Sequence, residues 1–89
     1  MKSRRNDKFR KKFSTLPELV KLQARKAYRQ FKTNPSYPSL EFKLIHTGKA
    51  IYSVRIGLYY RALGVLRDDV IVWFWIGSHA EYNALIDRL

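Results

Sequence analysis

The sequence contains no cysteine and only seven acidic residues among 89. Without cysteine the fold has no disulfide and no thiolate-bound metal, and this composition suits a reducing compartment, so we expect a cytoplasmic protein. The longest apolar run, residues 70–76, is too short to cross a bilayer. The basic first residues, MKSRRNDKFRKKF, are not followed by the apolar run of a secretory signal.

Positive charge is the strongest feature of the composition. Eighteen Lys and Arg oppose seven Asp and Glu, which gives a net charge of +11. A small domain with this charge attracts polyanions, so nucleic acid or an acidic protein is the expected partner. A solvated basic surface is the simpler alternative. At this length, and with 46% apolar residues, we expect one domain over residues 1–89, in which residues 1–8 form a basic arm or a flexible tail.

A helix is predicted to begin at Thr15, because Thr15-Leu16-Pro17-Glu18 has the spacing of a capping box. It ends at Asn34, since the residue before Pro35 avoids helical geometry. Either one long helix or two short ones fits this stretch, and residues 9–13 read as an edge strand or as the start of the helix. The apolar positions at helical spacing are Leu16, Val20, Ala24, Ala27 and Phe31.

Four strands follow, at residues 40–46, 50–58, 60–66 and 70–76. The last has no polar face and is therefore predicted to be a central strand. Ser78-His79-Ala80-Glu81 is a second capping box, which begins a short C-terminal helix. The predicted fold is α+β, a small antiparallel meander with the long helix or helical pair on one face.

Two arginines and a histidine form the candidate site. A reversal centred on Leu58 places Arg55 directly opposite Arg61, and like charges there destabilise a ladder unless an anion is near. A hairpin centred near Asp68 places Arg61 beside Trp75, and His79 follows at that end of the sheet. Arginines bind phosphate, and a histidine in the first turn of a helix can transfer protons. We therefore predict a phosphate site.

Each candidate also has a structural interpretation. Arg55 and Arg61 can pair with Asp68, Asp69 or Glu81, while Tyr82, Trp73 and Trp75 can be core residues. Lys43 and Lys49, and the stripe on the first helix that includes Arg25 and Arg29, either contact RNA phosphates or are solvated. Two histidines, no cysteine and scattered carboxylates offer no metal site, so no metal or other cofactor is expected.

Three ordered segments, LPELVKLQARKAYRQFKTNPSYPSL, YSVRIGLYYRALG and VIVWFWIGSHAEYNAL, resemble the RelE/ParE superfamily, the toxins of bacterial type II toxin–antitoxin modules. The resemblance covers almost the whole chain and implies the same α+β order. RelE-like members are basic ribonucleases that cleave mRNA in the ribosomal A site without a metal. The resemblance also implies an acidic antitoxin partner, whose complex with the toxin often binds operator DNA.

By this resemblance Arg61 matches the arginine after the tight reversal, and Arg55 matches the basic position on the preceding strand. His79, in Gly-Ser-His, matches a proton-transfer histidine, and Tyr82 lies near a catalytic tyrosine. Ser53 and Arg55 stand where founding members have a lysine pair, so His79 would have to supply the missing proton-transfer group. Two alternatives remain open: a ParE-like toxin that poisons DNA gyrase, and a non-catalytic nucleic-acid-binding module.

Overall fold

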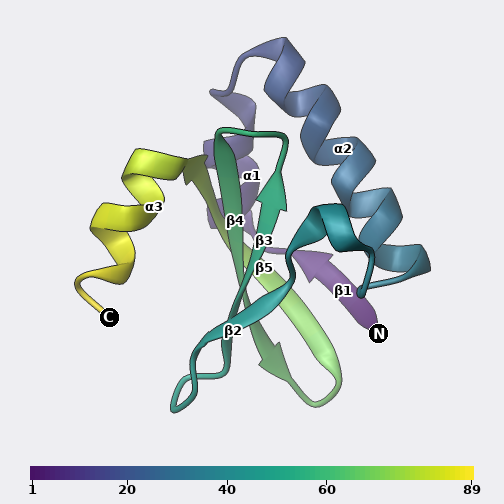
Figure 1. Cartoon of the computed structure of the whole chain (residues 1–89), viewed down its shortest axis with the longest axis vertical. Helices are drawn as coiled ribbons and strands as arrows, with labels where there is room; N and C mark the ends of the chain where they lie inside the picture. The colour runs from purple at the N-terminus through teal and green to yellow at the C-terminus, as the bar shows by residue number, and fades with distance from the viewer.

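The computed structural model describes residues 1–89 and contains a five-stranded sheet in the order β1-β5-β4-β3-β2 (Figure 1). Strands β2 to β5 form the predicted antiparallel meander, and β1 adds to its edge parallel to β5. The strands are β1 (Lys2–Arg5), β2 (Lys43–His46), β3 (Ile51–Ile56), β4 (Tyr60–Arg67) and β5 (Val70–Ser78). The α+β prediction is confirmed.

The first residues form an edge strand, where the sequence suggested a basic arm. Lys2 pairs with Val70 and Arg5 with Trp73, and the Asn6 N–H donates to the Trp73 carbonyl. Residues 9–13 belong to a helix, α1 (Asp7–Ser14), because the Asn6 side chain accepts from the Phe9 N–H and caps it. Asn6 therefore both completes the pairing of β1 with β5 and caps α1, so the strand and the helix follow one another directly.

Between Thr15 and Asn34 the structure has one long helix, which is one of the two alternatives predicted, and α1 precedes it. Helix α2 (Glu18–Thr33) ends at Asn34 as expected. The predicted cap at Thr15 is wrong, because Thr15 is the C-cap of α1 and has helical backbone angles. Its hydroxyl donates to the Lys12 carbonyl at the end of α1, and the N-cap of α2 is Pro17, which makes no side-chain hydrogen bond.

Helices cover both faces of the sheet (Figure 1). The first, which we call the α1/α2 face, carries the main core of Phe31, Leu40, Ile71, Trp73 and Ile76 among others. The second, the α3 face, is partly covered by α3 (His79–Ile86), where Tyr82 packs with Ile51 and Leu63. A short 3₁₀ helix, η1 (Pro38–Leu40), connects α2 to β2. No helix has both the length and the apolar character needed to span a membrane.

A bulge in β5 sends the two tryptophans to opposite faces. Leu63 pairs with Trp75 but Gly64 pairs with Trp73, so Phe74 is an extra residue in β5. Trp73 therefore enters the main core, and Trp75 packs on the α3 face. The predicted pairing of Arg61 with Trp75 is wrong, because the bulge and the position of the turn shift the partner of Arg61 to Gly77.

The β4–β5 turn consists of Asp68 and Asp69, which both have positive φ, 50° and 66°. Two positive φ values in a two-residue hairpin loop favour glycine at the second position. We expect Asp69→Gly to stabilise the protein by about 0.5–1 kcal/mol in urea unfolding, because glycine adopts this conformation without steric cost. Asp69→Val should destabilise it, and equal stabilities for the two variants would contradict the assignment.

Candidate functional site

Arg55 and Arg61 lie directly opposite one another in the β3–β4 ladder, as the sequence predicted. Both side chains converge on one carboxylate, that of Glu41. Arg55 Nη1 donates to Glu41 Oε2 at 2.8 Å, and Arg61 Nη2 donates to Glu41 Oε1 at 2.6 Å. The partners predicted as alternatives, Asp68, Asp69 and Glu81, make neither contact. The anion that this pair requires is supplied by the chain itself.

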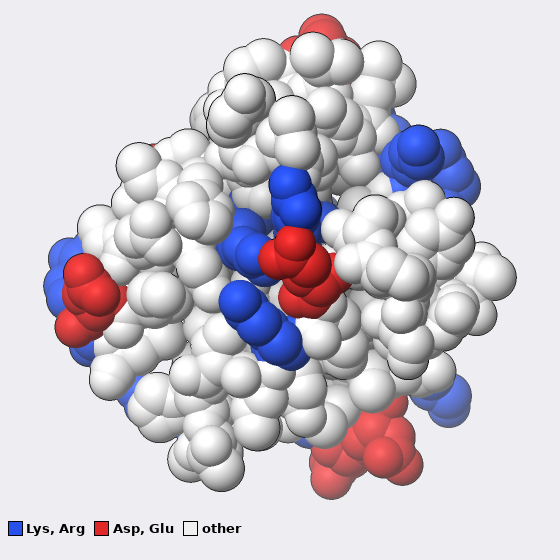
Figure 2. Space-filling view, viewed as in Figure 1, with Lys and Arg blue, Asp and Glu red and all other residues white.

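Glu41 occupies a particular backbone position that presents its side chain to both arginines. It follows η1 as its C-cap and has left-handed angles, φ 44° and ψ 46°. This conformation is unfavourable for a residue with a Cβ, so the two ion pairs help to offset its cost. Figure 2 shows acidic atoms enclosed by basic ones near the middle of the viewed face. The carboxylate remains partly open to solvent, with 41% of the side chain exposed.

Arg61 is a buried cation, with only 6% of its side chain exposed. Its Nη1 donates to the Ser53 hydroxyl at 3.1 Å, and its guanidinium lies over the Tyr82 ring, 5.3 Å from the centroid. Its Nε is buried without a hydrogen-bond partner. A buried charge is costly unless it is paired and hydrogen-bonded, so Glu41, Ser53 and Tyr82 together make this position tolerable.

His79 is the first residue of α3 and is exposed. The predicted capping box is present: Ser78 Oγ accepts from the Glu81 N–H, and the Glu81 carboxylate accepts from the Ser78 N–H. The His79 N–H donates to the Tyr59 carbonyl at 2.7 Å, which fixes the helix against the β3–β4 turn. Its ring lies 5.8 Å from that of Tyr82. Tyr82 therefore contacts both His79 and Arg61.

The predicted RNA-binding residues lie in three different places. Lys43 is exposed and pairs with Ser53 across the β2–β3 ladder, so its side chain lies on the same face as Arg61. Lys49 is exposed in the β2–β3 turn, away from this cluster. Arg25 and Arg29 belong to α2, which packs on the opposite, α1/α2 face. The structure therefore brings Lys43 to the cluster but not Arg25 or Arg29.

Glu41 is the site residue that sequence reasoning missed. It lies 14 and 20 residues from its arginine partners, so no local periodicity connects them. The sequence does contain one indication that Glu41 pairs with these arginines: it is the only acidic residue between Glu18 and Asp68. Hydrogen bonds from Arg61, and then from Arg55, hold the pKa of Glu41 below its ordinary value. The carboxylate is therefore ionised at neutral pH.

Known proteins resemble this chain both in sequence and in fold. A family model described as the ParE-like toxin domain matches residues 18–84. A RelB–RelE antitoxin–toxin complex from Methanococcus jannaschii contains a similar chain, with a TM-score of 0.72, 16% identity and coverage of 91% of this chain and 95% of that one. The isolated Escherichia coli RelE toxin gives 0.65 and 17%, covering 99% and 98%.

A copper-bound mutant toxin from Helicobacter pylori is also similar, with a TM-score of 0.61, 20% identity and coverage of 91% and 97%. No curated protein matches the chain. In the present structure no group of three or more histidine, aspartate or glutamate side chains is arranged to hold a metal ion. Because the sequence identities are only 16–20%, the similarity to these structures is a similarity of fold.

The Glu41 cluster should contribute a pH-dependent part of the stability. Because the folded-state pKa lies below the ordinary value of 4.5, the stabilisation is present at neutral pH and is lost as the pH falls through the folded-state pKa. We expect Glu41→Gln to lower the free energy of unfolding at pH 7, and the deficit to shrink at acidic pH. Urea unfolding at stepped pH values measures this difference.

The matched control for this measurement is Glu18→Gln. Glu18 lies 3.4 Å from Lys21, and its own side chain is 83% exposed, so the solvated carboxylate contributes little through this pair. This variant should follow the wild type at every pH. A Glu41→Gln deficit that stays constant from neutral to acidic pH would show that the carboxylate charge is not what stabilises the cluster.

Proposed function

The chain belongs to the ParE-like toxin domain family of the RelE/ParE superfamily, and from this premise we propose that it is the toxin of a type II toxin–antitoxin module that cleaves mRNA on the ribosome. The observation that carries the proposal is the convergence of Arg55 and Arg61 on a single anion position beside Tyr82 and His79. Two arginines that bind one carboxylate are equally suited to the oxygens of one phosphate.

Substrate binding replaces one anion with another. Glu41 now occupies the position between the arginines, and its side chain is half-open to solvent, so a phosphate can enter there while Glu41 moves aside. The two arginines then carry the charge that develops on the phosphate oxygens in the transition state. Arg61 stays in place during this exchange, because its hydrogen bond to Ser53 and its contact with the Tyr82 ring do not depend on Glu41.

The cleavage step needs a proton acceptor and a proton donor. The 2′-hydroxyl attacks the adjacent phosphorus, the bond to the 5′-oxygen breaks, and a cyclic phosphate is left on the upstream product. Glu41 is the carboxylate that the phosphate displaces from the arginines, and its release from these two cations makes it a stronger base, so we assign to it the acceptance of the 2′-hydroxyl proton. His79, exposed at the start of α3, donates a proton to the leaving oxygen.

Lys43 supplies a cation where the lysines of founding RelE-like members would be expected on β3. It lies across the ladder from Ser53, on the Arg61 face, and makes no ion pair within the chain. An exposed lysine on this edge strand is free to hold a neighbouring backbone phosphate, and Lys49 extends the same role to the turn. Ser53 itself acts only through its hydrogen bond to Arg61.

The proposed protein partner is an acidic antitoxin. The net charge of +11 favours an acidic protein, and a similar chain occurs in a complex of RelB with RelE. An antitoxin over the α3 face would cover the arginine cluster and keep the toxin inactive. The ribosome is the other proposed partner, since its RNA is a polyanion that attracts the same charge.

A second function is favoured by the burial of Arg61. Its guanidinium already has Glu41, Ser53 and Tyr82 as neighbours, as expected of an arginine that serves only the fold. In addition, Leu58 and Tyr59 at the β3–β4 turn are 67% and 72% exposed, which suits contact with a protein target. These features fit a ParE-like inhibitor of DNA gyrase, which needs no chemistry of its own.

Expression of the wild-type chain in a bacterium, followed by mapping of mRNA 5′ ends, tests the nuclease. We expect codon-phased cleavage that falls by about 10²–10⁴-fold in His79→Gln, because the proton donor is lost. His79 is exposed, so this change should leave the fold intact. Arg67→Gln is the matched control, since Arg67 is an exposed arginine at the far end of β4 and should retain full activity.

Glu41→Gln separates a role in proton transfer from a role in holding the arginines. The glutamine oxygen can still accept from one arginine, so loss of cleavage in a folded Glu41→Gln protein supports the base. Intact mRNA in wild-type cells, together with inhibition of gyrase supercoiling by the purified protein, would reject the nuclease in favour of the ParE-like function.

A further inference from the structure

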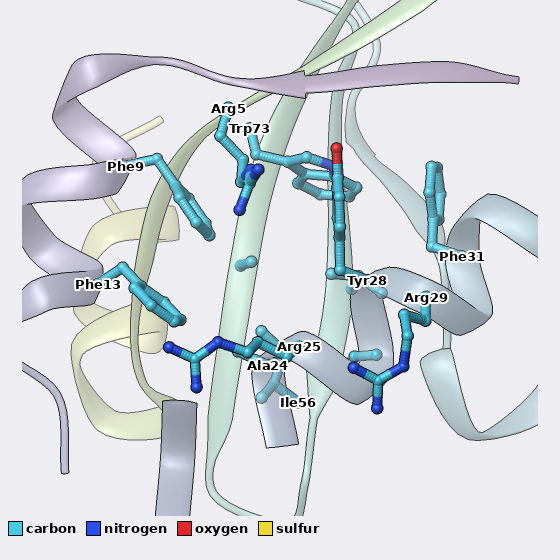
Figure 3. Close-up of a pocket in the computed structure, with 13 residues that line it drawn as sticks. Arg5, Phe9, Phe13, Ala24, Arg25, Tyr28, Arg29, Phe31, Ile56 and Trp73 are labelled. Atoms are coloured by element: carbon cyan, nitrogen blue, oxygen red, sulfur yellow. The ribbon is translucent and has the colours of Figure 1, made fainter. Parts of the chain in front are cut away.

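A cavity lies on the α1/α2 face, on the other side of the sheet from the arginine cluster. It has a volume of about 200 Å³ and lies between α1, α2 and the middle of the sheet. Phe9 and Phe13 of α1 form one wall, and Tyr28 of α2 lies across from them with Trp73 of β5 (Figure 3). This cavity takes no part in the function proposed above.

Small side chains account for the cavity. Helix α1 packs mainly on β5 and α2 packs mainly on β3, so neither helix is centred on β4, the strand that lies between them. The residue of β4 that faces the cavity is Ala62, and α2 presents Ala24 and Ala27 to it. Three alanines therefore stand where larger apolar side chains would close the gap. An apolar void of this kind costs stability unless something fills it.

Unpaired arginines surround the mouth of the cavity. Arg5 lies over the Tyr28 ring, 4.9 Å from its centroid, and Arg25 lies over the Phe13 ring at 5.4 Å. Figure 3 shows both guanidinium groups at the edge of the apolar space. Neither arginine, nor the nearby Arg29, forms an ion pair with an acidic residue of the chain. The aromatic faces hold Arg5 and Arg25 in position, while their charge is left for a partner.

Trp73 adds a donor without an acceptor. Its side chain lines the cavity and is 3% exposed, and its indole N–H is buried with no hydrogen-bond partner. An unpartnered buried N–H costs about 1–3 kcal/mol, so nearly all such groups in folded proteins find a partner. The arginines at the mouth are the main polar groups of an otherwise apolar lining, which is the usual arrangement of a small-molecule site.

We propose that this cavity binds a small hydrophobic carboxylate, with its apolar body between Phe9, Phe13 and Trp73 and its carboxylate against Arg5 and Arg25. The apolar lining favours a ligand with an apolar body, and the unpaired arginines at the mouth favour a ligand with an anionic group at one end. Pockets for drug-sized ligands have roughly 300–1,000 Å³, so this one accepts a single aromatic ring or a short acyl chain. Binding here is independent of whether the protein is a nuclease or a gyrase inhibitor.

The test is a titration of the purified chain with 3-phenylpropionate, followed by calorimetry and by the NMR signals of the two indole N–H groups. We expect saturable binding that shifts the Trp73 signal more than that of Trp75. The uncharged 3-phenylpropionamide, which has the same apolar body, should bind about tenfold more weakly, because it has no negative charge and cannot form an ion pair with the arginines.

Substitutions locate the site. Ala62→Leu should abolish binding by filling the cavity, and Ala24→Leu fills it from α2 if the first variant does not fold. Arg25→Gln should weaken the acid about tenfold and leave the amide unchanged. Arg67→Gln, an exposed arginine remote from the cavity, is the matched control and should bind as the wild type does.

Several results would overturn the proposal. No saturable binding of the acid would do so, and so would equal affinities for the acid and the amide. Binding that survives in both cavity-filling variants would place the ligand elsewhere. Binding lost in Arg55→Gln but retained in Arg25→Gln would assign the acid to the Glu41 cluster, and would leave the proposed nuclease function untouched.

Discussion

The bridge from Glu41 to Arg55 and Arg61 is the interaction on which the α3 face depends. Two like charges opposite one another destabilise a strand pair, and one of them is buried. A single carboxylate between them removes the repulsion and pairs the buried charge. The bridge also connects four elements, because Glu41 follows η1, the arginines belong to β3 and β4, and Tyr82 of α3 lies on Arg61.

The Glu41 bridge shows how the proposed phosphate site can also stabilise the fold. An anion must occupy the position between the arginines for the fold to be stable, and the chain supplies one that is partly open to solvent. A phosphate can satisfy the same requirement. In the proposed function the anion position therefore has two occupants in turn, and exchange between them does not leave Arg61 as an unpaired buried charge.

The main features of the fold could be read from the sequence because they depend on local patterns. Alternation around Leu58 gave the correct register of Arg55 with Arg61, and the Ser78–Glu81 spacing gave the start of α3. Asn34 before Pro35 gave the end of α2. Each of these signals lies within a few residues, where backbone preferences and side-chain spacing decide the outcome.

The rest depends on contacts between distant residues or on irregular geometry. The extra residue at Phe74 shifts the partner of Arg61, and no local preference marks it. Thr15 carries a capping signal, but it is the C-cap of α1, and its hydroxyl donates to the Lys12 carbonyl of that helix. Glu41 has left-handed angles and distant partners, so its role appears only when η1 is placed beside β3. Within the predicted site, His79 and Arg61 are connected through Tyr82, whose ring lies near both side chains.

The parallel pairing of β1 with β5 also sets the order in which the chain can fold. Lys2 pairs with Val70, so the first strand to be synthesised has no partner until most of the domain has been translated. The antiparallel hairpins between β2 and β5 join close neighbours and can form early, whereas closing the long loop to β1 has a larger entropic cost. Helix α1 directly follows β1 and packs on β5, so it also cannot pack until β5 has been synthesised. A nascent chain therefore gains the sheet that carries the arginine pair before it gains its N-terminal edge.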